Sequence, residues 1–269
     1  MFNIFRNKRE KKLLSLEAEL EIAKKQLISD LEKNGVEFLI SKMASSEVYS
    51  ELILERRKID LSYCSEDSVS WYAYRQSEIL NSQDEKNELM ALLENEKYLD
   101  FKKYIYSCLA SICRNTNEKD LFNFLIDKVQ KEEDERIKVS ILSRLSDVVK
   151  DSGYNIEPIK ILVAEGTADE SHAAIDALSN TNDPEVEDIL LNEFKITSPH
   201  MKGMICGSLS TVGTLKSIPV LKEAYKKARD VFLRMVIDDA VYRIEIRAKA
   251  ATNIGIANSG AGRKYNQQQ

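Results

Sequence analysis

The chain has 269 residues with a formal net charge of −5, and 43% of its residues are hydrophobic. Only nine glycines and four prolines occur, so the composition favours helices over a sheet. No apolar run approaches the roughly 20 residues of a bilayer-spanning helix, and no signal-peptide core precedes a cleavage site, so we expect a cytoplasmic protein without a transmembrane segment.

Residues 1–34 are predicted to form a long amphipathic helix. Apolar residues recur there in alternating steps of three and four, a pattern typical of a coiled-coil seam: Leu13, Leu16, Leu20, Ala23 and Leu27. The run is short, because Asp30 occupies the next seam position. Two interpretations stay open: a self-associating coiled coil, which would make a homo-oligomer, and a cap packed over the first repeat.

The first twelve residues combine a short apolar segment, 1–5, with a basic segment, 6–12. Basic charge beside apolar side chains is typical of peripheral contact with a membrane. Five residues bury little apolar area, however, and basic charge near a helix start is also ordinary on a solvated helix. We favour the solvated helix and keep membrane contact through residues 1–12 as the minor alternative.

Residues 35–83 do not follow the pattern of the later segments and are predicted to be an atypical helical capping region. Their densest aromatic cluster contains Tyr63, Trp71, Tyr72 and Tyr74. Large aromatic side chains contribute strongly to the packing of protein cores. We therefore expect these rings to pack an irregular terminal repeat rather than to line a ligand pocket.

Residues 84–249 contain five copies of a helical pair, spaced by 31 to 36 residues. The second helices are predicted at 101–112, 137–148, 170–181, 201–212 and 233–244, each beginning at a residue called position zero. Positions three, four, seven, eight and eleven are mostly small or apolar and fall on one helical stripe, so each helix has a face to bury. Position eight reads Leu109, Leu145, Leu178, Leu209 and Val241.

Capping residues agree with this register. Four residues whose side-chain oxygens can accept free N–H groups stand three places before position zero: Asp134, Thr167, Ser198 and Asp230. The first helices of the pairs are predicted at 85–95, 118–130, 156–164, 184–194 and 215–227. A helical pair with an exposed apolar face is unstable alone, so the pairs must stack as an all-α superhelix, an alpha-solenoid.

These residues resemble the HEAT repeats, and more narrowly the subtype first noted in phycobilisome lyases. Segment 207–221, GSLSTVGTLKSIPVL, is similar to that family's pattern of small residue, Leu, small residue, apolar residue and Gly, followed by apolar-Pro-x-Leu. The third unit departs from the pattern, with Glu170 at position zero and Ser171 at position one. The resemblance covers 84–249 and implies a HEAT-like solenoid, but no particular activity.

Segment 250–269 is rich in Gly, Asn and Gln and is predicted to be a disordered polar tail. Charge is uneven before it. Residues 157–193 contain ten acidic residues and one basic residue, a net of −9, whereas 195–269 contains thirteen basic and five acidic residues, a net of +8. Because sequence order is spatial order in a solenoid, we expect an acidic middle and a basic C-terminal end, which either attract a charged partner or are simply solvated.

The sequence predicts no enzyme, no cofactor and no metal. It shows no nucleophile paired with a base and no Gly-rich phosphate loop. His172 and His200 lie outside any zinc-ligand spacing. The cysteines have no paired spacing and are expected to be buried free thiols. They are Cys64, Cys108, Cys113 and Cys206.

A partner is expected on the face of the second helices opposite the buried stripe, at positions two, six and nine. In HEAT-like stacks the second helices line the concave face, so this face is the candidate binding surface. The alternative is that its small residues merely allow the helices to crowd. The candidate binding residues are Lys103, Ser107, Ser143, His172, Asp176, Met235, Asp239 and Tyr242.

Three functions stay open. The leading one is a non-enzymatic scaffold or adaptor that binds another protein, as an inhibitor or an assembly factor. The second is nucleic-acid binding similar to that of HEAT-like alkylpurine DNA glycosylases, which the sequence disfavours because the predicted groove is acidic in its middle and Trp71 lies outside the repeats. The third, a bilin lyase, is implied only by the repeat subtype.

Overall fold

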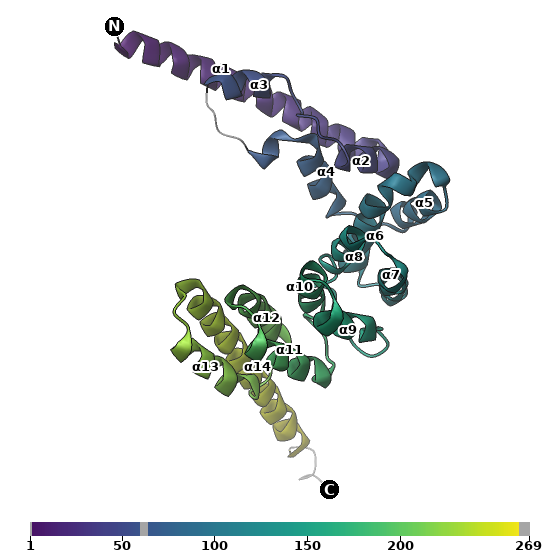
Figure 1. Cartoon of the computed structure of the whole chain (residues 1–269), viewed down its shortest axis with the longest axis vertical. Coiled ribbons are helices and arrows are strands. Elements are labelled where there is room, and N and C mark those ends of the chain that lie inside the picture. Colours follow the sequence, from purple (N-terminus) through teal and green to yellow (C-terminus); the bar gives the residue numbers. More distant parts are fainter. Residues whose placement is uncertain (1, 60–63, 264–269) are drawn as a thin grey trace. The chain divides into compact units, whose positions relative to one another are not determined.

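The computed structural model describes the backbone of residues 2–59 and 64–263, and the side chains of residues 10, 12–59 and 64–251. All regular elements in this part of the chain are helices, which confirms the predicted all-α class (Figure 1). The chain divides into two compact units, Met1–Thr116 and Asn117–Gln269. The division falls directly after the first of the five predicted repeats.

The first unit begins with the long helix that the sequence predicts, and its apolar seam is covered by neighbouring helices. Helix α1 packs against α2, α3 and α4, and the side chains of Leu16, Leu20 and Leu31 are buried. Helix α1 thus packs on the helices before the first repeat, and the coiled coil and the cap over the first repeat both stay predictions. The helices of this unit are α1 (Phe2–Lys33), α2 (Gly35–Met43), α3 (Leu52–Ile59), α4 (Val69–Ser77), α5 (Gln83–Leu93) and α6 (Lys102–Thr116).

Of the predicted aromatic cluster before the first repeat, Tyr72 packs in the interior of this unit, whereas Trp71 and Tyr74 are half-buried. Tyr72 is buried, and its ring meets those of Tyr49 and Trp71 edge-on, with centroids 5.5 and 4.9 Å apart. Tyr63 lies outside the described residues, as do the side chains of residues 1–9 and 11, on which the proposed membrane contact depends.

The second unit is a succession of helical hairpins. Each helix packs against its hairpin partner, and the first helices α7, α9, α11 and α13 contact one another in order, as do the second helices α8, α10, α12 and α14. The helices are α7 (Lys119–Lys131), α8 (Glu135–Leu142), α9 (Glu157–Glu165), α10 (Ala168–Ala177), α11 (Pro184–Ile196), α12 (Pro199–Val212), α13 (Ser217–Lys227) and α14 (Val231–Arg263).

The predicted register is confirmed at the positions that test it most directly. All five residues at position eight are buried, from Leu109 at 0% exposure to Val241 at 7%. Thr167 forms a capping box with Glu170, and the side chains of Asp134, Ser198 and Asp230 accept backbone N–H groups of the helices that follow. The capping residues and the period of the apolar residues therefore indicate the same helix register in the folded chain.

Two second helices end earlier than predicted. Helix α8 stops at Leu142 and α10 at Ala177, whereas the apolar period continued for several residues. The backbones beyond them meet in an isolated bridge, where the N–H of Lys150 donates to the carbonyl of Asn180 at 2.9 Å. The buried ammonium of Lys150 donates to the carbonyl of Leu145 at 3.0 Å. In a longer α8 the carbonyl of Leu145 would accept a backbone N–H of the same helix, and here the side chain of Lys150 takes that place.

The last helix is longer than predicted. Its backbone continues through Arg263, into the segment expected to be a disordered tail, while residues 264–269 lie outside the described part of the chain. A run of alanines around residues 248–251 supports this extension, because alanine has the highest helix propensity.

In the second unit, the fourth residue of α7, of α9 and of α11 contacts the segment that leads into the next first helix. On α7 this residue is Phe122, whose ring packs edge-on against Tyr154 with centroids 5.1 Å apart. On α9 it is Lys160, whose ammonium lies 2.6 Å from Asp183 and 3.0 Å from Glu185. Neighbouring hairpins are therefore joined at an equivalent place by different chemistry.

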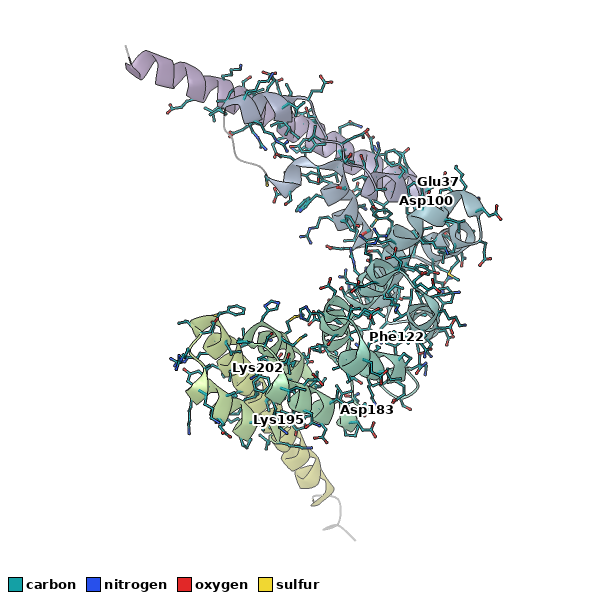
Figure 2. The ribbon with its side chains drawn as sticks, viewed as in Figure 1. Glu37, Asp100, Phe122, Asp183, Lys195 and Lys202 are labelled. Carbon is teal, nitrogen blue, oxygen red and sulfur yellow. The ribbon has the colours of Figure 1, made fainter. Side chains whose placement is uncertain are left out.

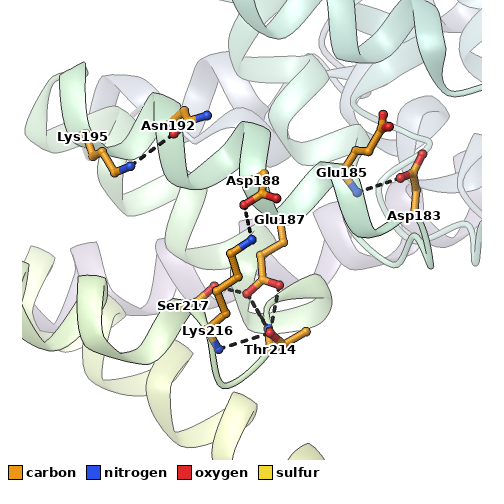
Figure 3. Close-up of polar contacts among 9 residues, drawn as sticks. All are labelled: Asp183, Glu185, Glu187, Asp188, Asn192, Lys195, Thr214, Lys216 and Ser217. Carbon is orange, nitrogen blue, oxygen red and sulfur yellow. Dashed lines mark hydrogen bonds and ion pairs between the residues drawn. The ribbon is translucent and has the colours of Figure 1, made fainter.

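On α11 the fourth residue is Glu187, a buried carboxylate. It accepts hydrogen bonds from the backbone N–H of Thr214 at 2.8 Å and from the hydroxyl of Ser217 at 2.5 Å (Figure 3). Lys216, between them, forms an ion pair with Asp188. Helix α13 has no side-chain cap of its own, so Glu187 places negative charge at its N-terminus, where the helix dipole favours it.

Candidate functional site

The candidate site is the exposed side of α10, α12 and α14, which lie next to one another in that order. We call this surface the second-helix face. It contains His172 and Asp176 of α10, His200, Gly203 and Gly207 of α12, and Phe232, Met235, Asp239, Tyr242 and Ile246 of α14.

A polar centre lies where α10 meets α12. The rings of His172 and His200 contact each other edge-on, with centroids 5.6 Å apart. Asp176, one turn after His172, is half-buried, and in the described part of the chain its carboxylate accepts no hydrogen bond. Burial raises the pKa of the Asp176 carboxyl above its ordinary value, and the charge of His172 only partly opposes this effect. An incompletely solvated carboxylate of this kind is a favourable acceptor for a donor on a partner.

Helix α12 contributes almost no side-chain bulk between its neighbours. A Cβ at Gly207 would meet nothing within 4 Å, whereas one at Gly203 would lie 3.7 Å from the ring of Phe232. The backbone of α12 is therefore accessible at Gly207. Another molecule can approach the main chain closely there, which a larger residue would prevent.

Helix α14 carries an exposed apolar stripe, which we define as Phe232, Met235, Tyr242 and Ile246. Their exposed fractions are 62, 59, 62 and 46% respectively. Steps of three, seven and four residues place the four side chains within about 80° of the helix circumference. Four large apolar side chains exposed on one stripe are the strongest sign of an interaction surface on this face.

Protein-family models, curated proteins and solved structures were compared with the chain, and none of them matches it. Within the described residues, no helix combines the length and the apolar character that a bilayer crossing requires. The second-helix face is therefore interpreted from its own chemistry.

Five of the predicted binding residues meet on this face: His172, Asp176, Met235, Asp239 and Tyr242. Asp239 forms an ion pair with Arg243 at 2.7 Å, so its charge is already partly used. The five residues form two groups, His172 and Asp176 on α10 and the other three on α14, because α12 lies between these helices.

The other three predicted residues are placed differently. Ser143, the residue directly after α8, is exposed, but its hydroxyl donates to the carbonyl of Val139 in that helix at 2.8 Å. Ser107 is only 1% exposed, so the prediction that it faces a partner is wrong. Lys103 lies on the same helix, in the first unit, with its ammonium over the ring of Tyr104. Ser107 fails because α6 is buried on more than one side, which a single apolar stripe does not reveal.

Sequence reasoning missed His200, Phe232 and Ile246. The first two stand one residue before position zero of their helices, and one turn before the face positions that the repeat template includes. Extending the helical period backwards by one turn would have found them. Ile246 lies after the last template position, and extending the helical period forwards by one turn from Tyr242 would have found it.

A cluster of three acidic residues near α9 has the spacing of a metal-ion site, but a lysine occupies it. Carboxylate oxygens of Glu157, Asp183 and Glu185 lie within 4.8 Å of one another. The ammonium of Lys160 contacts all three, at 2.7, 2.6 and 3.0 Å. Burial alone would lower the pKa of Lys160, but its hydrogen bonds to these acids raise the pKa above its ordinary value. The lysine thus supplies the positive charge of this cluster.

Proposed function

We propose that the protein is a non-enzymatic scaffold or adaptor, built from HEAT-like repeats, which binds another protein through the second-helix face. The ordered succession of hairpins in the second unit supports the repeat assignment. So does the segment 207–221, in which Leu209 and Leu221 are both fully buried. Such an adaptor would act as an inhibitor of its partner or as an assembly factor within a larger complex.

The observation that carries the proposal is the apolar stripe of α14. Burying a large apolar side chain contributes roughly 1.5 to 3 kcal/mol, and aromatic residues such as Tyr242 are enriched among the residues that dominate binding energy. The polar centre at His172 and Asp176 would add directional hydrogen bonds beside these apolar contacts. Gly207 between the two regions would let a partner helix lie close to α12.

Quantitative affinity purification from the native cell tests this proposal. The wild-type chain is compared with the double variant Met235→Glu, Tyr242→Glu, which places two charges on the apolar stripe. The matched control is Ile161→Glu, Ile196→Glu, because these residues are 51 and 79% exposed on the first helices α9 and α11. Thermal melts establish that all three proteins fold.

We expect at least one protein to be recovered with the wild type and the control variant but not with the stripe variant. Its binding is then measured with purified components. Recovery that is equal for all three chains would contradict the second-helix face as the binding surface. The purified wild-type chain is also mixed with duplex DNA at low salt. Binding that weakens steeply as the salt concentration rises would instead favour a nucleic-acid partner.

A further inference from the structure

A pocket of about 680 Å³ opens in the second unit, where α11 and α13 end and α12 and α14 begin. Its apolar lining residues include Phe194, Val220, Ala224 and Leu233. Phe194 and Leu233 belong to the buried core, so the floor of the pocket is the core itself. The pocket shares no residue with the second-helix face.

Charged side chains line the same pocket. Four are basic and two are acidic, a net of +2, although the whole chain has a net charge of −5. The basic residues are Lys195, Lys202, Lys227 and Arg229, and the acidic ones are Glu223 and Asp230. Figure 2 labels Lys195 and Lys202 in this part of the unit. The electrostatic potential in the pocket is therefore positive, although the net charge of the chain is negative.

The two acidic groups are already engaged. Glu223 forms an ion pair with Lys227 at 2.6 Å. Asp230 caps α14 by accepting the backbone N–H of Leu233 at 3.1 Å. The Glu223–Lys227 pair is neutral as a whole, so the remaining charges are Lys195, Lys202 and Arg229 against Asp230, which still gives a net of +2.

Three cations in the pocket have no carboxylate partner within the described residues. Lys195 donates to the amide oxygen of Asn192 at 3.2 Å, and the ammonium of Lys202 lies 5.6 Å from the centroid of the Phe194 ring. Arg229 is exposed and forms no ion pair in this part of the chain. A carboxylate or phosphate placed beside these cations would form charge-assisted hydrogen bonds with them.

We infer that this pocket binds a small amphipathic anion, with the apolar part against Phe194, Val220 and Leu233 and an acidic head group held by Lys195, Lys202 and Arg229. The volume lies in the range of small-molecule sites, which are mostly apolar with a few convergent polar groups. Guanidinium and ammonium groups pair well with carboxylates and phosphates. This inference is independent of the proposed protein binding, because it concerns a different surface.

Isothermal titration calorimetry of the full chain tests the inference, with monomeric dodecanoate as the probe. Dodecyltrimethylammonium has the same chain with the opposite charge, and acetate has the head group without the chain. The double variant Lys202→Glu, Arg229→Glu reverses two of the cations. Its matched control, Lys226→Glu, Lys249→Glu, makes the same change of net charge at exposed residues outside the pocket.

We expect dodecanoate to bind the wild type and the control variant with similar affinity, and the Lys202→Glu, Arg229→Glu variant at least about tenfold more weakly. Dodecyltrimethylammonium and acetate should bind no chain detectably. Absence of dodecanoate binding, equal binding of the cationic probe, or equal loss in the control variant would overturn the inference. Binding to phosphatidylglycerol vesicles without binding to monomeric dodecanoate would also overturn it, in favour of a membrane surface. The three probes decide the question on the wild type even where a variant fails to fold.

Discussion

The ammonium of Lys160 lies 2.6 Å from a carboxylate oxygen of Asp183, and the same carboxylate caps α11 by accepting the N–H of Glu185 at 2.8 Å. One side chain thus both starts a helix and binds the preceding hairpin. A substitution at Asp183 would therefore remove both the cap of α11 and the contact with the preceding hairpin.

Removing Lys160 should be costly for this reason. We expect Lys160→Ala to lower the free energy of unfolding by roughly 1 to 3 kcal/mol, because hydrogen bonds to charged groups are lost and three carboxylates are left close together. Urea unfolding measures the change. Lys226→Ala, at an exposed lysine, is the control. An equal effect of the two substitutions would show that the cluster contributes little to stability.

Glu187 should make stability depend on pH. Burial alone would raise the pKa of its carboxyl, but hydrogen bonds from Ser217 and Thr214 lower the pKa below its ordinary value of 4.5. Its contribution is then present above the unfolded-state pKa and is lost as the pH falls through the lower folded-state pKa. We expect Glu187→Gln to lower the free energy of unfolding by about 1 to 2 kcal/mol at pH 7 and by less in acid.

Unfolding at several pH values checks this, with Glu165→Gln as the control at an exposed glutamate. A difference between wild type and Glu187→Gln that stays constant from neutral to acidic pH would rule out the ionised carboxylate as its cause.

Asp176 should have the opposite effect. Because burial raises its carboxyl pKa, its contribution is favourable below the unfolded-state pKa and is lost as the pH rises through the folded-state pKa. We expect Asp176→Asn to raise the melting temperature at pH 7, with a gain that shrinks towards pH 3. Asp151→Asn, at an exposed aspartate, should change little. A lower melting temperature for Asp176→Asn at pH 7 would mean that the ionised carboxylate stabilises the fold.

Leu209 tests the buried register. It is fully buried on α12, and we expect Leu209→Ala to lower the free energy of unfolding by roughly 2 to 5 kcal/mol. Leu215, which is 60% exposed, provides the control, with a loss below about 0.5 kcal/mol expected for Leu215→Ala. Comparable effects in chemical unfolding would contradict a core position for Leu209.

The thiols should differ in reactivity. Cys108, Cys113 and Cys206 are buried as predicted, whereas Cys64 is exposed, contrary to the expectation for all four. Burial raises the pKa of Cys206 to about 12, and the thiolate is the reactive form. We expect one rapidly reacting thiol per native chain and four after unfolding, measured with a chromogenic disulfide reagent. Cys64→Ser should abolish the rapid reaction, and its persistence would place another cysteine at the surface.

The positions of the helices were predictable because their signals are local. The caps Thr167, Ser198 and Asp230 act within a single turn, and the apolar stripe that contains Leu209 repeats every few residues, so both can be recognised without knowing which helices pack together. The early end of α8 was not predictable. It depends on Lys150 pairing with Asn180, thirty residues away, and on a lysine that is buried despite its charge.

By itself, the sequence determined the all-α class, the order of the helical pairs and one buried stripe on each second helix. Only the tertiary structure decided that Phe232 and Ile246 extend the exposed stripe of α14, and that Lys195, Lys202 and Arg229 line one pocket. The physical reason is distance along the chain. Helix period and capping act over one to four residues, whereas an exposed stripe or a pocket depends on where the ends of successive helices meet.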